Sequence, residues 1–126
     1  MSVYKQIGTT LVLLVISAQC HAEPWKFVWS ARSHEWQTVS GQGELKRTKT
    51  ALAGVLVGTN GIEYPVSVKL TGQQALGELQ FPSGPSYLKG TYRLAKQKGL
   101  NNCWETIQLF DGHNFLGLSR NSTCEP

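Results

Sequence analysis

One segment alternates apolar and polar side chains more clearly than any other: Ile62-Glu63-Tyr64-Pro65-Val66-Ser67-Val68-Lys69-Leu70. Every second residue from Ile62 to Leu70 is apolar, whereas Glu63, Ser67 and Lys69 between them are polar. A period of two places one face of a β-strand on a core and the other in water. Because Pro65 cannot donate a hydrogen bond to a ladder, we expect this strand to lie at an edge or to carry a bulge there.

Shorter runs of the same kind lie before and after this segment, separated by turn residues such as Asn60-Gly61. They predict strands at residues 25–29, 35–39, 51–57, 62–70, 76–81, 87–94, 103–110 and 115–118. A helical turn is expected only within residues 95–102. About eight short strands predict an all-β fold, either a small antiparallel up-and-down barrel, lipocalin-like, or a compact sandwich. The glycines inside strands favour the barrel if they allow curvature, or they reflect crowding against aromatic side chains: Gly54, Gly77, Gly90 and Gly117.

The first 22 residues have the layout of a secretory signal peptide. Lys5 precedes an apolar run at residues 11–16 that is too short to span a bilayer, and small or polar residues follow it. Cleavage after Ala22, or alternatively after Ala18, would release the protein into the periplasm or the medium. We therefore expect a signal peptide at residues 1–22 and one β-barrel domain at residues 23–126, with no membrane span. The alternatives are a lipid anchor on Cys20 and a core helix formed by the apolar run.

Two cysteines remain after the leader, Cys103 and Cys124, and an oxidising compartment favours a disulfide bond between them. A reactive thiol or a metal site would be the alternative. Neither cysteine has a second cysteine or a histidine at the spacing of zinc ligands, so we expect no metal and no cofactor.

Charge and length restrict the classes of protein that fit. The chain has 126 residues, a net charge of +4 and 16% charged residues, which fits one compact domain and not a chain kept disordered by charge. The basic residues at 46–49 and 96–98 are expected in solvated turns or strand edges, with contact to an acidic partner as the alternative. An exported protein without aromatic residues among its cations is not expected to bind nucleic acid.

Few residues have the pattern of a catalytic site. Asp111 and His113 fit a turn, and Ser33, His34 and Glu35 are neighbours that would point to opposite faces of an extended chain. The glutamates are scattered, and a hydrolase that uses a carboxylate pair across strands is the enzymatic alternative. We expect no catalytic residues and no enzyme.

The candidate binding residues form two sets. Trp25 and Trp29 share a strand face with Phe27, and Trp36 follows in the next strand. They are expected to fill the interior or, alternatively, to line the mouth of a site for a small ligand or sugar. The other candidates, which would contact a protein partner, are His34, Ser40, Gly41, Glu44, Ser83 and Tyr87. Loops at residues 40–44 and 82–86 would then reach into a cleft of that partner.

Two short fragments resemble the motifs of lysozyme inhibitors. Ser40-Gly41 is similar to their Ser-Gly, and Tyr87-Leu88-Lys89-Gly90 is similar to their later Lys-Gly, although the tyrosine after the first motif is missing and Glu44 lies nearby instead. The whole layout resembles small periplasmic β-barrel inhibitors of lysozyme and immunity proteins. Together with the exported address, the small rigid scaffold, the polar loops and the lack of catalytic residues, this resemblance leads us to expect an exported monomer or homodimer that inhibits or neutralises an enzyme acting on the cell envelope through protein–protein contact.

Overall fold

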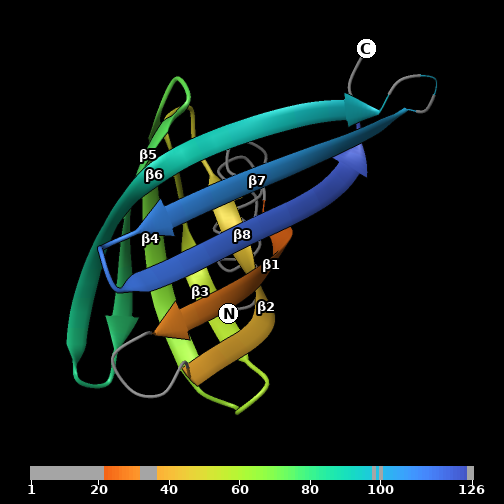
Figure 1. Ribbon diagram of the computed structural model, residues 1–126. Helices are drawn as coiled ribbons and strands as arrows, with labels where there is room; N and C mark the ends of the chain where they lie inside the picture. Colours follow the sequence, from red (N-terminus) through yellow and green to blue (C-terminus); the bar gives the residue numbers. More distant parts are fainter. Residues whose placement is uncertain (1–21, 32–36, 98, 100, 125–126) are drawn as a thin grey trace, which may run out of the picture.

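The computed structural model describes residues 22–31, 37–97, 99 and 101–124, which form a closed antiparallel barrel (Figure 1). Each strand pairs with the next in the sequence, and β1 pairs with β8 to close the sheet. This order confirms the up-and-down barrel and decides against the sandwich. The strands are β1 (Ala22–Ala31), β2 (Gln37–Arg47), β3 (Ala51–Gly58), β4 (Glu63–Thr71), β5 (Gln74–Phe81), β6 (Gly84–Gln97), β7 (Asn102–Phe110) and β8 (Asn114–Thr123).

All eight predicted strands are present, and most are longer than the alternation indicated. Both ends of the segment 95–102, where alone a helical turn was expected to be possible, are strand, because β6 continues to Gln97 and β7 begins at Asn102. These two residues face each other in the β6–β7 ladder, so strand pairing outweighs the local turn preference. Ile62 lies just before β4 and is exposed.

Pro65 lies where β4 has only one neighbouring strand. It pairs with Val55 of β3, whereas the ladder between β4 and β5 begins one residue later, at Val66 and Leu79. The missing amide donor therefore falls at a local edge, as expected for proline in a strand.

Aromatic and aliphatic side chains fill the interior of the barrel. The Trp29 and Phe81 ring centroids are 4.7 Å apart, and Tyr64 packs edge-on against Phe81 and Phe27. The interpretation of Trp25, Phe27 and Trp29 as core residues is confirmed, since all three are buried. The remaining buried core side chains are Leu45, Leu52, Leu56, Val66, Val68, Ala75, Leu79, Leu88, Ile107, Leu109, Leu116 and Leu118.

Residues 40–44 lie inside β2 and are not the loop that the sequence predicted. A Cβ atom added to Gly41 would lie 2.0 Å from the Val57 carbonyl oxygen, and one added to Gly43 would lie 2.2 Å from that of Val55. The two glycines therefore permit β2 to approach the backbone of β3 closely, which a loop would not require.

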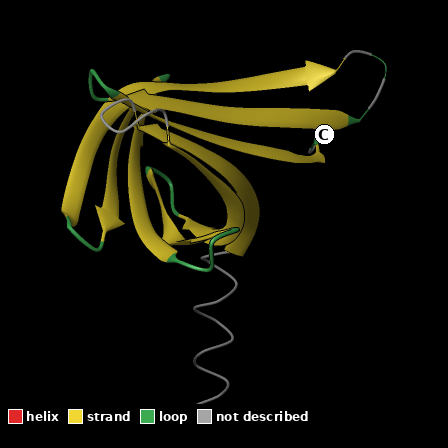
Figure 2. Ribbon diagram, turned by 60° about the horizontal axis from the view of Figure 1, so that its bottom comes forward, coloured by secondary structure: helices red, strands yellow, loops and turns green. Residues whose placement is uncertain are grey.

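Three strands extend past the barrel wall as an arm, which is clearest in Figure 2. The ladder between β5 and β6 ends at Gln74 and Thr91, and the ladder between β8 and β1 ends at Ser119 and Lys26. Beyond these points β6, β7 and β8 pair only with one another. We define the arm as residues 92–97, 102–106 and 120–123.

The predicted disulfide bond between Cys103 and Cys124 is confirmed, with a Cα–Cα distance of 5.2 Å. Cys103 is buried near the start of β7, and Cys124 directly follows β8. The bond therefore fastens the last described residue of the chain to the arm.

Replacing Cys103 and Cys124 together by serine is expected to lower the free energy of unfolding by about 3 kcal/mol, because the bond closes a loop of about 20 residues in the unfolded chain. Urea titrations of the variant and of the oxidised protein measure the difference. The reduced wild-type protein should match the variant, and equal stability of the oxidised and reduced forms would contradict the prediction.

Candidate functional site

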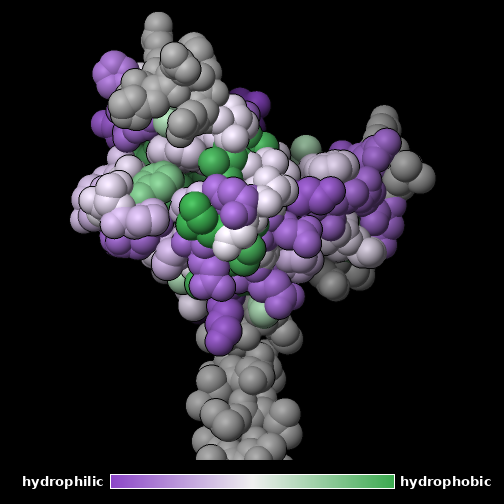
Figure 3. Space-filling view, turned by 90° about the horizontal axis from the view of Figure 1, so that it is seen from below, coloured by the Kyte–Doolittle hydropathy of each residue, from purple (hydrophilic) through white to green (hydrophobic). Residues whose placement is uncertain are grey.

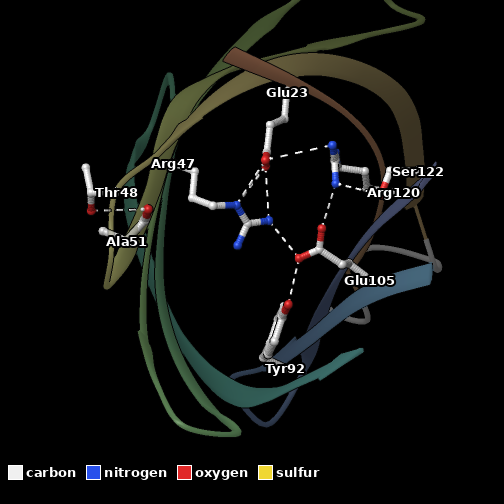
Figure 4. Close-up of polar contacts among 8 residues, drawn as sticks. All are labelled: Glu23, Arg47, Thr48, Ala51, Tyr92, Glu105, Arg120 and Ser122. Carbon is white, nitrogen blue, oxygen red and sulfur yellow. Dashed lines mark hydrogen bonds and ion pairs between the residues drawn. The ribbon is translucent and has the colours of Figure 1, made fainter. Parts of the chain in front are cut away.

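A charged cluster closes the barrel at the base of the arm (Figure 4). Glu105 of β7 lies at its centre and is only 6% exposed. Its Oε2 accepts hydrogen bonds from Arg47 Nη2 at 2.6 Å and from the Tyr92 hydroxyl at 2.6 Å, and its Oε1 accepts one from Arg120 Nη1 at 2.7 Å. Arg47 Nε also lies 3.0 Å from each carboxylate oxygen of Glu23. Two carboxylates and two guanidinium groups thus balance one another.

The cluster joins two parts of the barrel that share no backbone ladder at this level. Glu23 and Arg47 belong to the wall formed by β1 and β2, whereas Tyr92, Glu105 and Arg120 belong to β6, β7 and β8. Side chains therefore connect the arm to the wall where the ladder between β8 and β1 has ended. We infer a structural role for this cluster, because its carboxylates and guanidinium groups form ion pairs with one another.

The pKa values follow from these contacts. Burial alone would raise the pKa of Glu105, but the hydrogen bond from Tyr92 and the charge of Arg47 outweigh it and hold that pKa below its ordinary value. Burial, together with the hydrogen bond to Glu105, raises the pKa of Tyr92 to about 12. The cluster is therefore ionised at Glu105 and neutral at Tyr92 over the physiological range of pH.

Replacing Tyr92 by phenylalanine is expected to lower the free energy of unfolding at pH 7 by about 2 kcal/mol, through loss of the hydrogen bond to a charged group. This difference should shrink between pH 10 and 12. In that range an unfolded tyrosine ionises near pH 10 while Tyr92 keeps its proton, so the wild-type protein loses stability as pH rises. Urea titrations of both proteins at pH 7, 10 and 11 test this, and a constant difference would contradict it.

Two donors at the junction between β1 and β8 remain without a partner among the described residues. They are the indole Nε1 of Trp25 and the Nε of Arg120, and both atoms are buried. Trp25 and Arg120 both line a hollow at this junction.

A groove of about 1060 Å³ lies on the outer wall over β1, β2 and β3. Three exposed valines, Val28, Val55 and Val57, form its apolar part. Lys26 and Glu44 are the charged residues that line it, and Ser40, Gln42, Thr59 and Ser119 add polar groups. In Figure 3, hydrophobic atoms gather near the middle of the face seen from below, with hydrophilic atoms around them. The groove has the mixed composition of a protein-binding surface.

Of the predicted binding residues, the structure brings three together: Ser40, Gly41 and Glu44 all line the groove. Ser83 lies in the turn between β5 and β6, and Tyr87 is 67% exposed on β6, so neither belongs to the groove.

Two of the predicted tryptophans, Trp25 and Trp29, are buried. Trp29 is packed in the core, and Trp25 is 1% exposed. His34 and Trp36 lie outside the described residues, as does the predicted signal peptide up to residue 21.

A turn forms where the sequence places Asp111 and His113, as expected. Asp111 Oδ1 accepts hydrogen bonds from the backbone amides of His113 and Asn114. In the described ranges no group of three His, Cys, Asp or Glu side chains is arranged to hold a metal ion. No helix within those ranges is long and apolar enough to cross a membrane.

The charged cluster was not predicted. Arg47 was expected in a solvated turn or strand edge, and it does lie at the end of β2, but its side chain is half-buried against Glu23 and Glu105. A signal was present in β7, where Cys103, Glu105, Ile107 and Leu109 share the inward face. A single charge in such an apolar row indicates a buried partner.

Comparisons of the whole chain give no relative from which a role could be transferred: no family model, no curated protein and no solved structure matches it.

Proposed function

We propose that the protein is an exported, non-catalytic binding protein that neutralises an enzyme acting on the cell envelope through protein–protein contact. The observation that carries the proposal is the filled interior of the barrel combined with an open groove on its outer wall. A barrel that binds a small molecule usually keeps a cavity in its lumen or mouth. Here the core and the charged cluster occupy that space, so we expect the partner protein to bind at the outer surface.

The disulfide bond supports export, because such bonds persist in oxidising compartments. The signal-peptide layout of residues 1–22 agrees with the same compartment. Export would place the protein where enzymes that degrade the cell wall act.

The state of the buried carboxylates supports a non-catalytic role. A hydrolase of the two-carboxylate type needs a general acid whose pKa is raised. The pKa of Glu105 is shifted in the opposite direction, and both Glu105 and Glu23 are held in ion pairs with arginine.

The proposal is tested by inhibition assays. The oxidised protein, produced with its own leader, is titrated against a panel of muramidases and cell-wall amidases, and saturable inhibition of at least one enzyme is expected. Val55→Arg in the groove should abolish inhibition, whereas Leu76→Arg, on the exposed face of β5, should preserve it. Absence of inhibition across the panel, or equal inhibition by both variants, would overturn the proposal.

A further inference from the structure

A notch of about 240 Å³ opens beside the groove, where β8 leaves β1. Lys26, Gln42 and Ser119 line both hollows, so the notch and the groove form one continuous concave surface. Trp104 and Asn121 of the arm line the notch but not the groove. The arm therefore adds a second wall to the surface that the proposed function uses.

Trp104 is an exposed anchor at this place. It points outward from β7 between Ala95 of β6 and Asn121 of β8, and it is 44% exposed. Tryptophan is enriched among the residues that dominate binding energy, because it buries a large rigid surface and keeps one polar donor. A partner that covered this indole would gain more binding free energy than from covering any valine in the groove.

Positive charge lies on both sides of the indole. Across the sheet, Lys26 of β1 pairs with Ser119, Ser119 with Thr106, and Thr106 with Arg93 of β6. This row of paired residues lies next to the row that holds Trp104. No acidic side chain lines the notch. Within the described ranges no carboxylate forms an ion pair with Lys26 or Arg93. An acidic group on a partner would therefore find the unpaired cation of Lys26 at the notch, with Arg93 nearby, whereas Glu44 disfavours acidic groups farther along the groove.

We propose that the notch and the groove together hold an extended segment of the protein partner that carries one acidic side chain at the notch. One acidic side chain enters the notch between Trp104 and Lys26, and apolar side chains lie along Val28, Val55 and Val57. This inference rests on the proposed function and specifies the chemistry of the partner segment. Charge complementarity selects the segment, and burial of the indole and the valines supplies affinity.

The test uses a synthetic peptide with one glutamate followed by alternating serine and valine, blocked at both ends, and the same peptide with glutamine in place of the glutamate. Each is titrated into the ¹⁵N-labelled oxidised protein. We expect saturable shifts of the Trp104 indole N–H and of the Ser119 and Asn121 amides. The glutamine peptide should bind at least about tenfold more weakly, as for loss of charge-assisted hydrogen bonds.

Matched variants distinguish binding at the notch from non-specific binding of the peptide. Trp104→Ala should weaken binding of the acidic peptide about tenfold and Lys26→Gln about fivefold, in keeping with the usual effect of interface anchors and charge pairs. Tyr87→Ala and Lys89→Gln remove an exposed aromatic ring and a cation away from the notch, and they should leave the affinity unchanged.

Several results would overturn the inference: no shifts, equal binding of the two peptides, shifts confined to the free edge of β6, or unchanged affinity of Trp104→Ala. A galacturonate oligomer that shifts the notch resonances while the peptide does not would also overturn it. Inhibition of an envelope enzyme without peptide binding would leave the proposed function intact and disprove only this inference. Peptide binding without inhibition of any enzyme would support this inference and contradict the proposed function.

Discussion

Replacing Glu105 by glutamine is expected to lower the free energy of unfolding by about 4 kcal/mol at pH 7, because removal of one partner from a buried ion cluster leaves the others uncompensated. Arg47 and Arg120 would then share the single carboxylate of Glu23. Glutamine keeps the size of the side chain, so the loss reports charge and not packing. Urea unfolding followed by tryptophan fluorescence measures the effect.

The matched control is Glu63→Gln, which removes an exposed carboxylate from β4 and should change stability by less than about 0.5 kcal/mol. The pKa of Glu105 is lowered in the fold, so its contribution is present above the unfolded pKa near 4.3. That contribution is lost as pH falls through the folded pKa. The difference between wild type and Glu105→Gln should therefore shrink in acid. A loss below about 1 kcal/mol at pH 7 would mean that the cluster behaves as a solvent-screened surface network.

Replacing Gly90 by alanine is expected to be still more disruptive, with a loss of about 4 kcal/mol or more, because no neighbour can yield. A Cβ atom at this position would lie 1.7 Å from the carbonyl oxygen of Gln108 and 2.7 Å from its carbonyl carbon. Both are backbone atoms of β7, so the two strands would have to separate at the base of the arm. Circular dichroism and the yield of soluble oxidised protein measure the damage.

Gly117→Ala is the control for this substitution. The nearest atoms to its added Cβ belong to the Phe115 ring, at 3.0 Å, and a half-buried side chain can shift more easily than backbone. We expect a change within about 1 kcal/mol, since alanine also restricts the unfolded chain. If Gly90→Ala folded as well as Gly117→Ala, close approach of the backbones would not be the reason for glycine in β6.

The strands were predictable because their signal is local. Alternation of side chains in β4 and β7 requires only neighbours two residues apart, and the turn at Asn60-Gly61 requires only two residues. The β2 segment around Ser40 was harder, because Gly41 and Gly43 resemble loop residues until the backbone of β3 is placed beside them.

The candidate site was predictable only in part. Ser40, Gly41 and Glu44 were identified from the sequence, and the structure places them in the groove. Trp104 was not identified, although the alternation of β7 places it on the outward face with Thr106 and Gln108. That it lines a notch could not be predicted, because the notch exists only where β8 has left β1.

By itself, the amino-acid sequence determined the all-β class, the approximate positions of the strands and the pairing of two cysteines, because periodicity and cysteine number are properties of the linear chain. The tertiary structure alone decided which distant residues meet. Arg47 and Glu105 are separated by 58 positions, and they bind each other only because closure of the barrel sets the register of every ladder. The charged cluster, the groove and the notch follow from that closure, since a shift of one residue in a ladder would turn each of these side chains to the opposite face.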